Sequence, residues 1–216
     1  MIDRAIFFAS VRARPFGGRL RRFQVEGLER LLAEAERRRL ADLRALAYVL
    51  ATAHHETAAT MQPIREIGRG RGRPYGEPDP QTGKAYYGRG YVQITWKVNY
   101  RRLGERLGVD LVAAPDRALE PGLAAAILFE GMQHGLFTGR ALGEFFAAGR
   151  ADWAGARRIV NGTDRADRIA DLARAYCAAL EAASRPATAP PARAGAIAAA
   201  ARRFFAALGA LFNRQE

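Results

Sequence analysis

The sequence has only one cysteine, Cys177, so no internal disulfide can form. Its place among the apolar residues of the 164–183 segment is typical of a buried helix face, and a catalytic thiol is not expected there. The first 18 residues also lack the long apolar stretch and the small-residue cleavage site of a secretory signal. We therefore expect a protein made in the cytoplasm without a signal peptide.

Lysine is scarce as well, and arginine supplies almost all of the positive charge. With 34 Lys and Arg against 22 Asp and Glu, the formal net charge is +12. Such a charge favours polyanions, among them nucleic acid, teichoic acid, lipopolysaccharide and acidic membranes, although a genome rich in G and C also enriches arginine. No low-complexity tract occupies the first 183 residues, and 49% of the chain is hydrophobic, so one folded domain with a tail is expected.

Apolar residues recur at helical spacing through most of the chain. The predicted helices cover 23–40, Asp42 to about Met61, 97–107, 121–136, 140–148, 152–160 and 164–183. Residues 63–90 are rich in Gly, Pro and Arg and are expected to form loops, and 91–96 is the only good strand candidate. The predicted fold class is mainly α with at most a small β-hairpin.

The composition changes after residue 183. Residues 184–195 are predicted to form a Pro- and Ala-rich linker, and 196–216 a short basic amphipathic helix. That helix is too short and too charged for a convincing membrane span. It is expected either to contact an anionic membrane or to pack on the domain.

The first candidate site is the run HHET at 54–57. A zinc-protease helix would need a second histidine four residues after the first, and Ala59 stands there, so that interpretation fails. A metal site that adds the distant His134 is not expected either. Glu56 ends an apolar helix face, where desolvation would keep a carboxyl group protonated and suited to general acid catalysis. The alternative is an ordinary Glu at a helix end, solvated or paired with Arg65.

Inverting hydrolysis of a glycosidic bond needs a second carboxylate, about 6.5 to 9.5 Å from the first, to activate water. Glu66 and Glu77 are the nearby choices. Both fall in or beside the long loop, where a catalytic base can be held over a cleft. Either of them could instead solvate the loop or pair with its arginines.

The second candidate site is the segment YYGRGYVQITW at 86–96, with Asn99 just beyond it. Aromatic rings such as that of Trp96 stack on the apolar faces of sugars, and glycines permit a close approach of the backbone to a ligand. Gln, Thr and Asn side chains offer directional hydrogen bonds to hydroxyl and acetamide groups. The mixture suits a sugar, and the alternative is a β-turn with a half-buried strand whose aromatic residues belong to the core.

Three blocks in this order resemble glycoside hydrolase family 19, and in particular its phage and prophage endolysin branch. They are HETAATMQPIRE at 55–66, YYGRGYVQITWKVNY at 86–100 and RRIVNG at 157–162. The resemblance implies a lysozyme-like, two-lobed helical catalytic domain with a substrate cleft over residues 1–183. The disulfide-forming cysteines of the plant chitinases are absent, which weighs against the secreted plant type.

The resemblance also implies roles for individual residues. Glu56 would be the general acid and Glu66 the general base, with Glu77 as the rival base. The implied substrate-binding residues are Tyr87, Arg89, Gln93, Thr95, Trp96, Asn99 and Asn161. Among these, Thr95 and Gln93 would help to hold the attacking water, and Tyr87 and Arg89 would shape the cleft or hold its loop. No metal or organic cofactor is implied.

The leading hypothesis is an endolysin-like, inverting hydrolase of bacterial peptidoglycan. It is expected to be a monomer that binds no nucleic acid and acts at the periplasmic cell wall after release from the cytoplasm. Chitin or chitooligosaccharides are the alternative substrates. A lytic transglycosylase would need one catalytic Glu and would give an anhydro product. From a different class, a non-enzymatic basic protein would bind membrane or nucleic acid through its arginines.

Overall fold

The computed structural model describes residues 2–184. The C-terminal helix predicted over 196–216, and all of the predicted linker except Ser184, lie outside the described residues. Helices dominate the described part, which confirms the predicted fold class. Among these residues, no helix is long and apolar enough to cross a membrane.

The helices and strands follow one another along the chain as α1 (Arg4–Ala13), α2 (Arg22–Arg37), α3 (Leu43–Glu56), β1 (Ile64–Arg65), η1 (Pro74–Gly76), β2 (Arg89–Gly90), α4 (Lys97–Leu107), η2 (Pro115–Leu119), α5 (Pro121–His134), α6 (Leu142–Phe145), β3 (Phe146–Ala147), β4 (Arg150–Ala151), η3 (Gly155–Ile159) and α7 (Ala166–Ser184). The η elements are 3-10 helices. The strands form two antiparallel pairs, β1 with β2 and β3 with β4.

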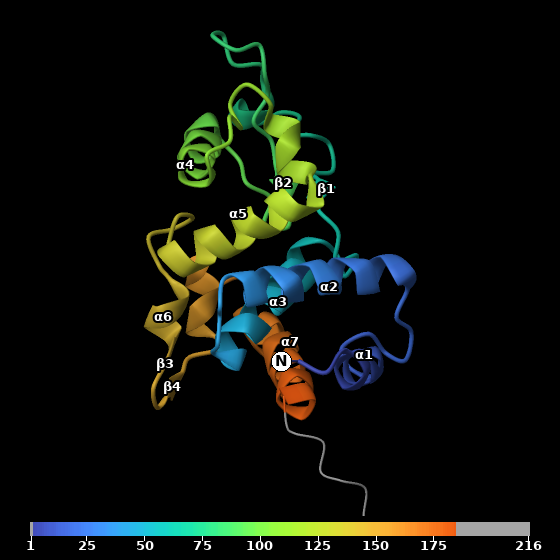
Figure 1. The fold of residues 1–216 in the computed structure, drawn as a ribbon. Coiled ribbons are helices and arrows are strands. Elements are labelled where there is room, and N and C mark those ends of the chain that lie inside the picture. Colours follow the sequence, from blue (N-terminus) through green and yellow to red (C-terminus); the bar gives the residue numbers. More distant parts are fainter. Residues whose placement is uncertain (1, 185–216) are drawn as a thin grey trace, which may run out of the picture. The chain divides into compact units, whose positions relative to one another are not determined.

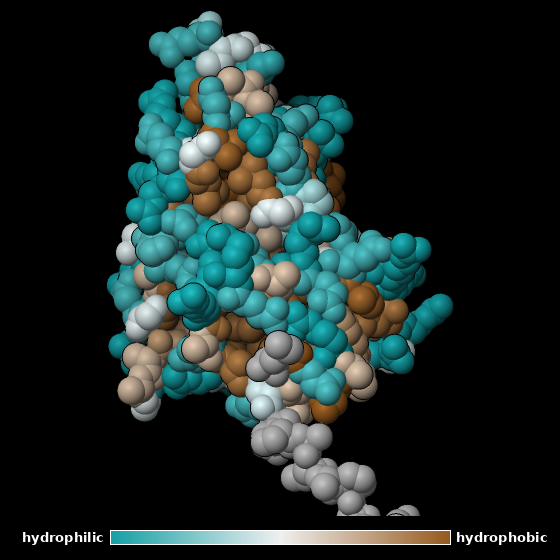
Figure 2. All heavy atoms as spheres, viewed as in Figure 1, coloured by the Kyte–Doolittle hydropathy of each residue, from teal (hydrophilic) through white to brown (hydrophobic). Residues whose placement is uncertain are grey.

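Helix α5 lies between two groups of elements (Figure 1). On one side are β1, β2 and α4, and on the other are α2, α3, α7 and α1. Helix α3 is central to the second group, because every residue from Ala45 to Ala53 is buried and the helix packs along α7. Hydrophilic side chains cover most of the visible face, with smaller hydrophobic areas between them (Figure 2).

Two predicted helix starts are confirmed. Asp42 is the N-cap of α3, and its carboxylate accepts hydrogen bonds from the N–H groups of Arg44 and Ala45 at 2.9 and 3.3 Å. Pro121 occupies the first turn of α5, where its missing N–H costs no hydrogen bond. Cys177 is buried on α7 as predicted.

The predicted end of the second helix is wrong, because α3 stops at Glu56 and not near Met61. Ala58 and Met61 have φ angles of 48° and 55°, which a right-handed helix cannot contain. The buried Thr57 stabilises this change of direction. Its hydroxyl donates to the carbonyl of Ala53 at 2.7 Å and accepts from the N–H of Met61 at 3.1 Å. Glu56 is thus the last residue of a helix whose end is tightly held.

The strand predicted over 91–96 is also wrong. Only Arg89–Gly90 pairs with β1, and Ile94 adds a single bridge to Arg89. Gln93 and Trp96 have φ angles of 53° and 68°, which a strand does not contain. The segment is therefore a turn that folds back onto β2.

Two predicted helices near the C-terminal side are shorter than expected. The 140–148 prediction holds only for α6, since the chain then enters the β3–β4 hairpin, whose turn contains Gly149 at a φ of 70°. The 152–160 prediction corresponds to the short 3-10 helix η3. Both segments have apolar spacing that suits one turn of helix, and spacing alone does not fix how far a helix continues.

Candidate active site

Glu66 directly follows β1, and the pairing of β1 with β2 brings it beside Gly88. The N–H of Gly88 donates to Oε2 of Glu66 at 2.9 Å, and the hydroxyl of Tyr75 donates to Oε1 at 2.9 Å. No basic side chain among residues 2–184 forms an ion pair with this carboxylate. Both of its oxygens are therefore oriented by neutral donors, and each keeps acceptor capacity for a further hydrogen bond.

Gly88 has no room for a side chain. A Cβ at this position would lie 2.9 Å from Oε1 of Gln93 and 3.1 Å from Cβ of Glu66. The amide nitrogen of Gln93 donates to the carbonyls of Ile64 and Gly90 at 2.9 and 3.1 Å. The structure thus brings Glu66 and Gln93, two of the predicted site residues, into one packed cluster.

Arg89 is only 4% exposed and holds the segment before it. Its guanidinium donates to the carbonyls of Ala85 and Tyr87, each at 3.1 Å, to the hydroxyl of Tyr100 at 3.0 Å and to Asp116 at 2.7 Å. It also lies 3.6 Å from the centre of the Tyr87 ring. These contacts fit the predicted role of holding the loop.

An aromatic pair lies next to Glu66. The rings of Tyr75 and Trp96 meet edge to face with centroids 5.5 Å apart, and Trp96 is 47% exposed. Both rings line a hollow of about 380 Å³, together with Glu77, Tyr86 and Lys97 among others. An exposed aromatic face beside an oriented carboxylate is suited to a sugar ring.

The remaining predicted residues differ in their surroundings. The side chain of Asn99 donates to the carbonyl of Thr95 at 2.9 Å, which ties the start of α4 to the preceding turn. Glu77 is exposed, and its carboxylate makes no hydrogen bond or ion pair within the described part of the chain. Asn161 is exposed and accepts a hydrogen bond from the N–H of Gly162.

Glu56 is joined to the third sequence block by an ion pair. Oε1 of Glu56 lies 2.8 Å from a guanidinium nitrogen of Arg157, which is only 4% exposed and also donates to the carbonyl of Asp164. Arg65, considered as a partner from the sequence, pairs with Asp116. Arg157 therefore orients the Glu56 carboxyl group. Within residues 2–184, no hydrogen bond joins Glu56 to Glu66.

His54, two residues before Glu56, is partly buried and packs against its neighbours. Nδ1 of His54 lies 3.0 Å from the hydroxyl of Tyr176, and its ring packs on Phe16 with centroids 4.9 Å apart. Burial lowers the pKa of His54 to about 4, so the ring is neutral at pH 7.

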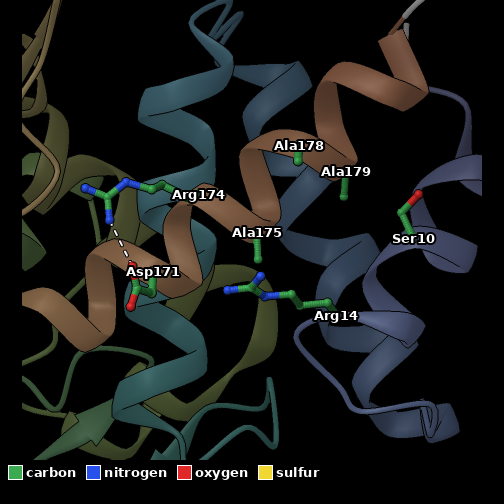
Figure 3. Close-up of a pocket in the computed structure, with 7 residues that line it drawn as sticks. All are labelled: Ser10, Arg14, Asp171, Arg174, Ala175, Ala178 and Ala179. Atoms are coloured by element: carbon green, nitrogen blue, oxygen red, sulfur yellow. Dashed lines mark hydrogen bonds and ion pairs between the residues drawn. The ribbon is translucent and has the colours of Figure 1, made fainter.

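A separate hollow lies between α1 and α7 (Figure 3). Its polar lining consists of Ser10, Arg14, Asp171 and Arg174, and the last two are joined by a 2.9 Å ion pair. None of the predicted site residues lines it. The arrangement around Glu66 and Trp96 is therefore the stronger candidate for the active site.

The chain is similar to known proteins over part of its length. The family model described as chitinase class I, glycoside hydrolase family 19, matches residues 71–130. That range contains Tyr75, Gly88, Gln93 and Trp96. Over these residues the chain is similar to glycoside hydrolase family 19.

Sequence relatives are similar over short segments. An endochitinase of Arabidopsis thaliana is 43% identical over 77 residues, which are 34% of this chain and 26% of the relative. Chitinase 3 of Oryza sativa subsp. japonica is 42% identical over 57 residues, which are 24% of this chain and 18% of the relative. The inactive chitinase-like protein 1 of Hevea brasiliensis is 53% identical over 34 residues, or 16% and 11% of the two chains. The match thus spans about a quarter of the Arabidopsis protein, and local similarity extends to a relative named as inactive.

Chitinase C from Streptomyces griseus HUT6037 has the same fold. The two structures align with a TM-score of 0.58 and 22% sequence identity, over 86% of this chain and 78% of the chitinase. Glu56 and Glu66 precede the segment matched by the family 19 model, so their catalytic roles stay predictions.

Proposed function

We propose that this protein is an inverting glycoside hydrolase of family 19 that acts on amino-sugar polysaccharides, with Glu56 as general acid and Glu66 as general base. The observation that carries the proposal is the orientation of Glu66, whose two oxygens accept hydrogen bonds from Tyr75 and Gly88 beside the exposed ring of Trp96. Relatives that are named as chitinases support the choice of an amino-sugar polymer.

In the proposed reaction, Glu56 protonates the glycosidic oxygen and Arg157 stabilises the carboxylate that remains. Glu66 removes a proton from a water molecule that attacks the opposite face of the sugar. Gln93 and Thr95 help to hold that water. Glu66 suits this role better than Glu77, because the exposed Glu77 carboxylate has no partner in the described structure that would orient it.

The proposed substrate is the glycan strand of bacterial peptidoglycan, cleaved in the manner of a phage or prophage endolysin after release from the cytoplasm. The net charge of +12 supports an anionic wall polymer over neutral chitin. Chitin and chitooligosaccharides stay the alternative, since the same two carboxylates would serve them.

Mass spectrometry of the products tests this proposal. Purified peptidoglycan and a chitooligosaccharide are incubated with the wild type and with Glu56→Gln, Glu66→Gln and Glu77→Gln. Water-added, reducing products are expected from the wild type and from Glu77→Gln, which is the matched control. Glu56→Gln and Glu66→Gln should each lose nearly all activity.

The other outcomes identify the alternatives. Anhydro products that survive loss of Glu66 would mean a lytic transglycosylase. Cleavage of the chitooligosaccharide alone would mean a chitinase. Loss of activity in Glu77→Gln but not in Glu66→Gln would mean that Glu77 is the general base. If the wild type cleaves neither substrate, a non-enzymatic polyanion-binding protein is the remaining alternative.

A further inference from the structure

A loop of three arginines follows Glu66. Residues 67–73, here called the arginine loop, read IGRGRGR, and the side chains of Arg69, Arg71 and Arg73 are all exposed. None of the three forms a hydrogen bond or ion pair through its side chain within residues 2–184. The neighbouring Arg65, by contrast, pairs with Asp116.

The main chain of the arginine loop forms its own hydrogen bonds. The N–H group of each of the three arginines donates to the carbonyl three residues earlier, at 2.9 to 3.0 Å. Gly70, at a φ of 72°, packs so closely on Tyr75 that a Cβ there would lie 2.9 Å from the ring. A side chain is therefore excluded at Gly70, and the guanidinium groups project from a compact scaffold.

The arginine loop is physically part of the candidate site. Glu66 precedes it directly, and its carbonyl accepts the hydrogen bond from the N–H of Arg69. Tyr75, which packs on Gly70, donates to Glu66 and contacts the ring of Trp96. A polymer that lies along Trp96 and Glu66 would thus pass close to this group of positive charges.

Within the described residues, no ion pair neutralises the positive charges of the arginine loop. Guanidinium groups that form no ion pairs repel one another, and they attract anions from solution. Their planar donor groups match the oxygen pairs of carboxylates and phosphates. Neutral chitin offers neither group.

We propose that the arginine loop is a substrate-binding element for carboxylate or phosphate groups attached to the glycan, and that it makes the site selective for an anionic amino-sugar polymer. The inference rests on the proposed function and names the substrate class of that site. It adds a recognition element outside the acid and base pair and outside the aromatic surface.

The test compares two variants with the same loss of charge. In the first, R69Q, R71Q and R73Q are combined. The matched control combines R12Q, R19Q and R30Q, whose side chains are exposed and have no hydrogen bond or ion pair in the described residues. Initial rates are measured on peptidoglycan with stem peptides, on peptidoglycan that also carries phosphate polymers, on glycan strands without either, and on a neutral chitooligosaccharide.

The arginine-loop variant is expected to lose roughly tenfold in rate on the anionic substrates at low salt, since several solvated ion pairs are lost together. The control should change by less than about twofold, and added salt should reduce the difference because the charges are exposed. A loss on stem-peptide substrate would identify carboxylates as the ligand, and a loss only with phosphate polymers would identify phosphates. Equal losses in both variants, or equal losses on neutral and anionic substrates, would overturn the inference.

Binding is measured separately so that the two proposals can fail independently. Glu56→Gln, with and without the three arginine-loop substitutions, is sedimented with intact cell-wall sacculi. If binding depends on the arginine loop and the wild type cleaves nothing, the proposed hydrolase activity is refuted and the proposed anion site is supported. Cleavage by the wild type, together with binding that the three arginine-loop substitutions do not change, would support the hydrolase and refute the anion site.

Discussion

The hydroxyl of Tyr75 donates a 2.9 Å hydrogen bond to Oε1 of Glu66. Tyr75→Phe removes this donor and keeps the ring that packs on Trp96. We expect kcat to fall roughly tenfold, because a hydrogen bond to a charged group contributes about 1.5 to 3 kcal/mol. KM should stay within about twofold if the ring alone contacts the sugar. Steady-state kinetics check this, with Tyr176→Phe as a control whose lost hydroxyl contacts His54. An unchanged kcat would show that Tyr75 does not orient the base.

Gly88→Ala tests how closely the cluster around Glu66 is packed. The new Cβ would lie 2.9 Å from Oε1 of Gln93 and 3.1 Å from Cβ of Glu66, so one of these side chains must move. We expect the free energy of unfolding to fall by about 1 to 3 kcal/mol. We expect the catalytic rate to fall by more than this loss of stability explains. Gly122→Ala, where a Cβ meets nothing within 4 Å, serves as the control. The free energy of unfolding and the catalytic rate of both variants are measured by denaturant melts and activity assays. Full activity in Gly88→Ala as well as in Gly122→Ala would contradict the prediction.

Arg157→Gln leaves Glu56 without its ionic partner. We expect a lower free energy of unfolding, by about 2 kcal/mol, since the pair is mostly buried but Glu56 retains some contact with solvent. Activity should fall at least tenfold because the carboxyl group loses its orientation. The double variant Glu56→Gln with Arg157→Gln should regain part of the stability and none of the activity. Additive losses of stability in this double-mutant cycle would show that the two residues do not interact.

Glu130 predicts how stability depends on pH. Burial opposes its ionisation, but hydrogen bonds from Arg38 and Arg106 outweigh burial and lower the pKa of Glu130 below its ordinary value of 4.5. Because the pKa is lower in the folded state, the ionised carboxylate stabilises the fold at any pH above the ordinary pKa. This stabilisation is lost as the pH falls through the lowered pKa of the folded state. Glu130→Gln should therefore cost about 2 to 3 kcal/mol at pH 7 and much less at an acidic pH at which Glu130 is protonated in the folded state. Urea melts at the two pH values measure the difference. A cost that is equal at both would refute this account.

The sequence predicted the fold best where the determining interactions are local. An N-cap at Asp42 and a proline at position 121 act within one helical turn, and both helices begin as expected. The predicted end of α3 failed because it depends on left-handed residues held by the buried Thr57, a tertiary effect that apolar spacing does not contain. The strand predicted over 91–96 failed because Gln93 and Trp96 also have positive φ angles, which the sequence pattern does not reveal.

The candidate site was predictable in part. The resemblance to family 19 pointed to Glu66 and Gln93, and the structure brings them together around Gly88. It missed Tyr75, which reaches Glu66 only because the loop between them closes on itself. Arg157 was not predicted although it lies within the third block, and an arginine in a block that resembles an enzyme family was a usable signal.

The burial of Cys177 has a practical consequence for the experiments above. The residue is 6% exposed, and burial raises the pKa of Cys177 to about 12, so almost no thiolate is present at neutral pH. A thiol-reactive dye would therefore label the native protein very slowly and the unfolded protein quickly. Because this is the only cysteine of the chain, the labelling rate reports how often α7 separates from the core. Every variant described here thus contains its own built-in probe of local opening.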